Sequence, residues 1–230
     1  MLPELYHLPS FYEPVSAISH LIGALVFLVL GCLVMWRGRR DRARLFLLGV
    51  YAFSGVLLFS MSGVYHMLEH DGTARRVMAR LDHAAIFGLI AGTFTAAHGI
   101  PFRGLLRWVP LAFIWSAAIT GITLKTIFFN DLAHGLGLLF YVTLGWFGII
   151  SAFLVMRRFG FFFIMPVLLG GLAYTIGGVL DFVKWPVLVP GLIHPHEVFH
   201  LAVLTGAWFH WRFVWDIAGG NWTMSPVSAA

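Results

Sequence analysis

The strongest constraint in this sequence is a succession of seven apolar stretches of about 20 residues each, the length that an α-helix needs to cross a bilayer core of roughly 30 Å. The connections between them are short, so consecutive helices must run antiparallel. The sequence therefore predicts an all-α polytopic membrane protein, a seven-transmembrane-helix bundle forming one domain over residues 1–230. We expect spans near residues 15–36, 45–68, 82–100, 106–128, 132–156, 161–184 and 195–217.

Composition supports this class. Hydrophobic residues make up 60% of the chain and charged residues 11%, which leaves too little polar surface to cover a water-soluble globule. Membrane lipid is therefore the expected surrounding partner, and the sequence indicates no soluble partner. Cys32 is the only cysteine, which excludes an internal disulfide and a metal site with more than one Cys ligand.

The positive charge serves membrane orientation. The net charge is +5, but the Lys and Arg residues cluster in short connections, a pattern typical of membrane topology and not of nucleic-acid binding. With seven spans, about five basic residues fall on the N-terminal face and about ten on the other. This bias favours a cytoplasmic C-terminus. Residues 1–13 contain no Lys or Arg and so lack the basic region of a signal peptide, and we expect the first span to stay in the mature protein.

Histidines single out one face of the bundle. Nine of the 11 histidines fall on or near the N-terminal face. Several of them, such as His7, His70 and His134, are equally explained by solvation at the headgroup level. Buried ionisable groups in membrane helices are costly without a partner, however, so their gathering on one side of several helices indicates a shared purpose.

His196 and His200 lie four residues apart, which places both rings on one face of the last helix. Such a pair suits Zn²⁺, which needs a third ligand, and His66 ends the second span at the same depth. Asp82, which we expect to open the third span, reaches that depth too, and Ser62, four residues before His66 on the same helical face, lies one turn deeper in the bilayer. Asp82 is a candidate proton acceptor or orienting carboxylate, or else a helix N-cap. Ser62 is a candidate hydrogen-bond donor to a substrate oxygen, or else a packing serine.

Three other interpretations stay open. Residues 196–200 read literally as the H-E-x-x-H of zinc metalloproteases, with Glu197 as base, although no later helix offers that family's third ligand. Bis-histidine haem binding has no use for a pair four residues apart. A water-filled pore needs more polar lining than the spans offer.

The pattern as a whole resembles the hemolysin III family, the bacterial branch of the progestin and adipoQ receptors, whose relatives include alkaline ceramidases. The residues that carry the resemblance follow in order along nearly the whole chain: Glu13, Ser16, Ser19-His20, Ser62-x-x-x-His66, Asp82 and His196-x-x-x-His200.

The resemblance implies zinc on His66, His196 and His200, with Ser62 and Asp82 near a metal-bound water. It implies a location in the bacterial inner (plasma) membrane and a zinc-dependent hydrolase acting on a lipid amide or ester, such as a ceramide, within the bilayer. The alternative is a non-catalytic, zinc-stabilised receptor or sensor. The receptor branch is held to have its zinc side in the cytoplasm, opposite to what the Arg distribution favours.

Overall fold

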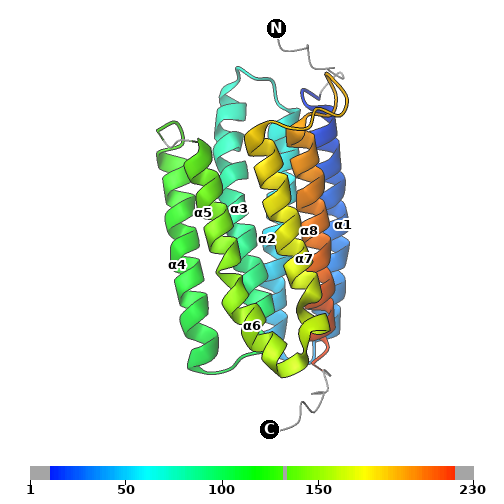
Figure 1. Cartoon of the computed structure of the whole chain (residues 1–230), viewed down its shortest axis with the longest axis vertical. Helices are drawn as coiled ribbons and strands as arrows, with labels where there is room; N and C mark the ends of the chain where they lie inside the picture. The colour runs from blue at the N-terminus through cyan, green and yellow to red at the C-terminus, as the bar shows by residue number, and fades with distance from the viewer. Residues whose placement is uncertain (1–10, 132–133, 221–230) are drawn as a thin grey trace.

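The computed structural model describes residues 11–131 and 134–220, and it is an antiparallel bundle of long helices with residues 11 and 220 at opposite ends of the bundle (Figure 1). The helices are α1 (Pro14–Gly38), α2 (Arg42–Met67), α3 (Thr73–Gly99), α4 (Leu105–Ile127), α5 (His134–Trp146), α6 (Gly148–Phe159), α7 (Phe161–Val183) and α8 (Pro195–Ala218). The protein is thus an all-α polytopic membrane protein.

Helices α5 and α6 together form one rod. The break falls at Phe147, whose backbone N–H still donates to the Thr143 carbonyl at 3.1 Å. Residues 135–159 act as a single apolar segment, and with α1, α2, α3, α4 and α7 they give six helices long and apolar enough to cross a membrane. The expected span at 132–156 starts on two residues outside the described part of the chain.

Helix α8 is the seventh rod, and it has 24 residues, the length of a membrane span. It carries several polar side chains, and three of them, His200, His210 and Glu197, are buried and so face the bundle. It packs between α1 and α7 (Figure 1). Burying its polar side chains in this way lets a less apolar helix belong to the same bundle.

Helix α3 extends well beyond its expected start. It begins at Thr73, nine residues before Asp82, with Gly72 as N-cap. The prediction that Asp82 opens the helix is therefore wrong, and so is the N-cap interpretation of this carboxylate. Apolar character marks only the part of a helix that lies in lipid, whereas the helix itself continues through the charged turns around Arg75, Arg76 and Arg80.

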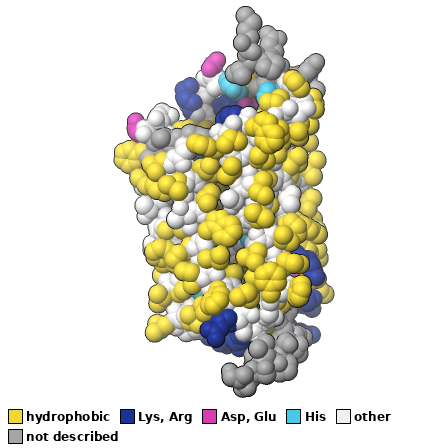
Figure 2. Space-filling model, in the orientation of Figure 1, with side chains coloured by type: hydrophobic (Ala, Val, Ile, Leu, Met, Phe, Trp, Pro, Cys, Tyr) yellow, Lys and Arg dark blue, Asp and Glu magenta, His cyan; other side chains and the backbone are white. Residues whose placement is uncertain are grey.

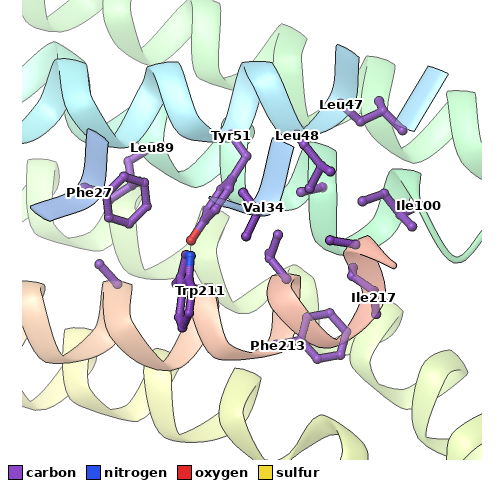
Figure 3. Packing of buried hydrophobic residues seen from close by; sticks show 14 of the residues in the cluster. Phe27, Val34, Leu47, Leu48, Tyr51, Leu89, Ile100, Trp211, Phe213 and Ile217 are labelled. Atoms are coloured by element: carbon purple, nitrogen blue, oxygen red, sulfur yellow. The ribbon is translucent and has the colours of Figure 1, made fainter. Parts of the chain in front are cut away.

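The larger buried hydrophobic cluster is formed mainly by residues of α1, α2, α3 and α8. Phe27, Tyr51 and Trp211 meet in this core (Figure 3), and the Trp211 indole N–H donates to the Leu30 carbonyl at 3.1 Å. Gly55 allows the Phe27 ring to lie directly against the α2 backbone, because a Cβ there would collide with the ring. This core fixes α2 and α8 relative to each other, which positions the side chains at their upper ends.

The two ends of the bundle differ in charge. On the face that Figure 2 shows, acidic and histidine side chains lie together with Lys and Arg at the end where α1 begins, whereas the charged side chains seen at the opposite end are Lys and Arg. At that opposite end, Arg37 donates to the Trp215 carbonyl at 3.0 Å and lies over the Trp215 ring. Aromatic and basic pairs of this kind are typical anchors at a membrane boundary.

Candidate metal centre

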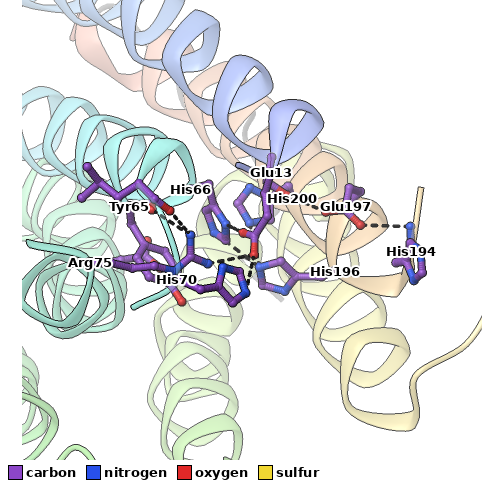
Figure 4. A network of polar contacts seen from close by, with 12 residues as sticks. Glu13, Tyr65, His66, His70, Arg75, His194, His196, Glu197 and His200 are labelled. Carbon is purple, nitrogen blue, oxygen red and sulfur yellow. Dashed lines mark hydrogen bonds and ion pairs between the residues drawn. The ribbon is translucent and has the colours of Figure 1, made fainter. Parts of the chain in front are cut away.

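Three imidazoles from two helices converge at the N-terminal end of the bundle. His66 ends α2, and His196 and His200 occupy the first turns of α8 (Figure 4). The His196 Nε2 atom lies 3.4 Å from His66 Nε2 and 3.2 Å from His200 Nε2. One nitrogen of each ring lies within 4.8 Å of the others, and His66 and His200 are buried. This group could hold a metal ion.

Glu13 lies directly behind His66. It contacts the His66 Nδ1 atom, and its other oxygen accepts a hydrogen bond from Arg75 at 2.8 Å (Figure 4). Burial alone would raise the pKa of Glu13, but the hydrogen bond from His66 and the charge of Arg75 outweigh it and lower the pKa to about 2. An ionised Glu13 accepts a hydrogen bond from the Nδ1–H of His66, which leaves the lone pair on His66 Nε2, the atom that faces the other two rings.

Asp181 contacts the outer nitrogen of His196, as Glu13 contacts that of His66. Its Oδ1 atom lies 3.3 Å from His196 Nδ1 and 3.1 Å from Lys184 Nζ. Nothing in the sequence assigned Asp181 a role, because its contact with His196 depends on how α7 packs against α8. The i, i+3 spacing to Lys184 was the only local signal.

Glu197 is engaged in helix capping. One carboxylate oxygen accepts from the Ser16 hydroxyl at 2.9 Å, and the other accepts from the His194 backbone N–H at 2.9 Å. The carboxylate thus caps α8 and ties it to α1, which supports a structural role over the general base of a metalloprotease. His20, whose role the sequence left open, lies against His200 with ring centroids 3.9 Å apart.

A cavity of about 470 Å³ opens beside this group. Ser62, Asp82 and His200 line it, and its mostly apolar wall reaches as far as His98 near the opposite end of the bundle. Ser62 is buried, and Asp82 lies 3.8 Å from the ring of its neighbour His83. In the described residues, neither Ser62 nor Asp82 makes a hydrogen bond or an ion pair with the three imidazoles.

The other histidines of the N-terminal face do not share this site. His70 is exposed and lies 3.8 Å from Glu13, at the rim of the network. His83 contacts the Ala79 carbonyl through Nδ1 at 2.8 Å, as a local helix contact. His7 lies outside the described residues, as does the side chain of His134.

The fold and the site together define a class: a polytopic helical membrane protein with a buried histidine group at one end of its bundle, next to an apolar cavity. Comparison with known proteins then gives the family. The family model described as "Haemolysin-III related" matches residues 10–211, and this chain belongs to that family.

Its relatives agree. The chain is 33% identical to Hemolysin-3 of Bacillus cereus over 197 residues, which cover 85% of this chain and 86% of that protein. It is 32% identical to the Hemolysin-3 homolog of Bacillus subtilis (strain 168) over 204 residues, covering 85% and 89%. A more distant similarity, 25% over 174 residues, links it to the human monocyte to macrophage differentiation factor, covering 72% and 68%.

Proposed function

We propose that the three histidines bind Zn²⁺ and that the protein hydrolyses a lipid amide or ester within the bilayer. The spacing of the imidazole nitrogens carries the proposal. Two nitrogens at about 2.0–2.1 Å from one zinc, at the tetrahedral angle, lie about 3.3–3.4 Å apart. The distances along His66, His196 and His200, 3.4 Å and 3.2 Å, fit that spacing.

The carboxylates behind the rings support a metal-binding role. Glu13 and Asp181 each contact the outer nitrogen of a histidine whose inner nitrogen faces the site. This arrangement fixes the tautomer and orientation of metal-ligating histidines and raises their basicity. Three protein ligands also match the count of a catalytic zinc site, which keeps one position for water or substrate.

The chemistry expected of the chain's own side chains is acid–base and electrostatic. Zinc, when bound, supplies Lewis acidity and lowers the pKa of water toward neutrality. Asp82 accepts the proton of the attacking water and returns it to the leaving nitrogen or oxygen as the bond to the acyl carbon breaks. Ser62 donates a hydrogen bond to the oxyanion that develops on the carbonyl.

The cavity supports a lipid as the substrate. It begins at His196 and His200, and continues between apolar residues such as Leu89, Val142 and Phe213 into the depth of the bundle. An apolar lining with a few convergent polar groups is typical of a small-molecule site. The same lining favours an acyl chain over the water-filled path that a pore requires, although two relatives carry the name Hemolysin-3.

Metal analysis of the purified protein tests the first half of the proposal. We expect about one zinc per chain in the parent and none in His66→Ala. Incubation with a panel of lipid amides and esters tests the second half: Asp82→Asn should keep its zinc and lose turnover. Equal activity in Asp82→Asn and the parent, on any lipid that is cleaved, removes Asp82 from the mechanism.

A second function is favoured by the cross-links between helices. His66 on α2 joins His196 and His200 on α8, and Ser16 on α1 bonds to Glu197 on α8. A zinc ion here would pin the bundle, as in a zinc-stabilised receptor or sensor whose shape responds to an occupant of the cavity. A closed fourth coordination position, measured by X-ray absorption on the zinc-loaded protein, supports the receptor, and an exchangeable water supports the hydrolase.

A further inference from the structure

Lys125 is a buried ammonium group inside the cavity. It lies near the end of α4, its residue is 5% exposed, and it lines the cavity together with Asp82, His83 and Tyr141. It therefore shares one enclosed space with the histidine group, although it comes from a helix that contributes nothing to that group.

This ammonium makes no hydrogen bond or ion pair with the described residues, although carboxylates line other parts of the same cavity. Lys125 Nζ lies over the Phe129 ring at 5.6 Å from the ring centroid. Lys184 provides the contrast, because its side chain is 65% exposed and paired with Asp181 at 3.1 Å. A buried charge without a partner is costly in a membrane helix, so such groups commonly serve a ligand.

Gly137 on α5 makes room for the ammonium. A Cβ added at Gly137 would lie 2.7 Å from Lys125 Nζ and 2.9 Å from its Cε. The lysine end thus lies against bare backbone, and Gly137 also lines the cavity. Lys125 Nζ and Cε are the end of a flexible side chain, so they can shift to accommodate an added methyl group. An alanine at 137 would therefore displace the ammonium while α4 and α5 stay packed together.

We infer that Lys125 binds a carboxylate carried by the lipid ligand, so that the ligand is an anionic lipid of the N-acyl amino acid type. The apolar wall suits the acyl chain, and one ammonium with three N–H donors suits one carboxylate. A doubly charged phosphate fits less well, because Asp82 and Asp181 line the same cavity. The amide of such a lipid would lie between Lys125 and the histidines. That this lipid is a substrate rests on the proposed function, whereas its binding to Lys125 does not.

The test compares two ligands that differ only in the carboxylate. N-oleoylglycine and N-oleoylethanolamide share the acyl chain and the amide, and their Kd values can be measured by calorimetry on the full-length, zinc-loaded protein in non-ionic detergent, with empty micelles as blank. We expect the parent to bind N-oleoylglycine at least tenfold more tightly than N-oleoylethanolamide, because only the carboxylate can form a charge-assisted hydrogen bond with Lys125. Lys125→Gln should abolish the preference, and Lys125→Arg should restore most of it.

Two further variants make the result specific. Gly137→Ala keeps every charge but displaces the ammonium, and should reduce the preference severalfold. Arg76→Gln removes one positive charge at the same end of the bundle, where Arg76 is exposed and bonded to Thr73, and should leave the preference unchanged. Zinc content and gel filtration confirm that each variant is folded.

The inference is overturned if the parent binds both lipids equally, if Arg76→Gln acts as strongly as Lys125→Gln, or if oleoyl lysophosphatidate binds more tightly than N-oleoylglycine. The experiment also distinguishes a failure of this inference from a failure of the proposed hydrolase function. N-oleoylglycine bound through Lys125 but never cleaved leaves the inference standing and removes the hydrolysis. Cleavage of N-oleoylglycine with the same KM by the parent and by Lys125→Gln supports the hydrolysis and overturns the role of Lys125.

Discussion

Buried histidines occupy both ends of the helix bundle, and their nitrogen atoms are used in opposite ways. At the N-terminal end, the inner nitrogens of His66, His196 and His200 face one another. At the other end, His98 bonds to the Ser151 hydroxyl at 2.8 Å through Nδ1 and to the Leu106 carbonyl at 2.6 Å through Nε2. All of its hydrogen-bonding capacity is therefore used within the protein.

A proline inside α4 explains the hydrogen bond between His98 and the Leu106 carbonyl. Leu106 lies in the first turn of α4, and the residue that should donate to its carbonyl, four positions later, is Pro110, which has no N–H. His98 Nε2–H supplies the missing donor, and its Nδ1 then accepts from Ser151. The comparison teaches that burial alone does not indicate a metal ligand, and that the convergence of three ring nitrogens at one place is what distinguishes the N-terminal group.

The largest expected effect tests this comparison directly. His200→Ala should lose bound zinc almost completely, because two histidine ligands remain, whereas His98→Leu should retain about one zinc per chain. Inductively coupled plasma mass spectrometry on both purified variants measures the difference. Zinc lost from His98→Leu as readily as from His200→Ala would contradict the separation of the two ends.

A smaller effect is expected from the carboxylate behind His196. Asp181→Asn keeps the shape of the side chain but weakens its hold on His196 Nδ1, and should lower zinc affinity about 10–100-fold. Competition with a chelator of known affinity measures it. Asp71→Asn is the matched control, since Asp71 lies in the exposed α2–α3 connection at the same end, and its zinc affinity should equal that of the parent.

The sequence could predict that the three histidines lie together, but not which carboxylates contact them. His66, His196 and His200 were predicted together because a helix end and an i, i+4 pair fall at one membrane depth, information that hydropathy and spacing contain. Glu13 and Asp181 were given no role, because their contacts depend on which helices are neighbours around the bundle. Depth follows from the sequence position within a span, whereas lateral order follows from packing between distant segments.

The sequence also marked the ends of α2 and α8 better than the start of α3. His66 does end its helix and His196 does begin its own, since Leu68 is extended and Pro195 occupies the first turn. Thr73 starts α3 far outside the apolar stretch, because Arg75 continues the helix while bonded to the Leu68 carbonyl and Glu13. A helix that leaves the lipid has no hydropathy signal to mark its end.

An effect of moderate size tests the role of His98 in stability. His98→Leu leaves the Leu106 carbonyl and the Ser151 hydroxyl without their partner, and should cost about 1–3 kcal/mol of unfolding free energy. Pro110→Ala returns an N–H to that carbonyl, so the cost of His98→Leu should fall in the Pro110→Ala background. A double-mutant cycle of unfolding in detergent measures this coupling. Additive costs would show that His98 does not replace the donor lacking at Pro110.

The smallest effect is expected at Asp41, which begins α2 at the end opposite to His66. Its side chain accepts from the Arg44 backbone N–H at 3.0 Å, and this hydrogen bond lowers the pKa of Asp41. A lowered pKa in the folded state means that the stabilisation is present above the unfolded value of about 3.9 and is lost as the pH falls through the folded value.

Because the Asp41 side chain is 41% exposed, Asp41→Ala should cost only about 0.5–1 kcal/mol near neutral pH, at the lower end for an N-cap, and Asp41→Asn less. Unfolding in detergent at neutral and acidic pH measures both variants, and the difference between parent and Asp41→Ala should shrink at the lower pH. Zinc content should stay at the parent's value in each, since α2 is a rigid rod with its cap at one end and His66 at the other. Zinc lost from Asp41→Ala would mean that the start of α2 governs the position of His66, and that the two ends of the bundle do not act independently.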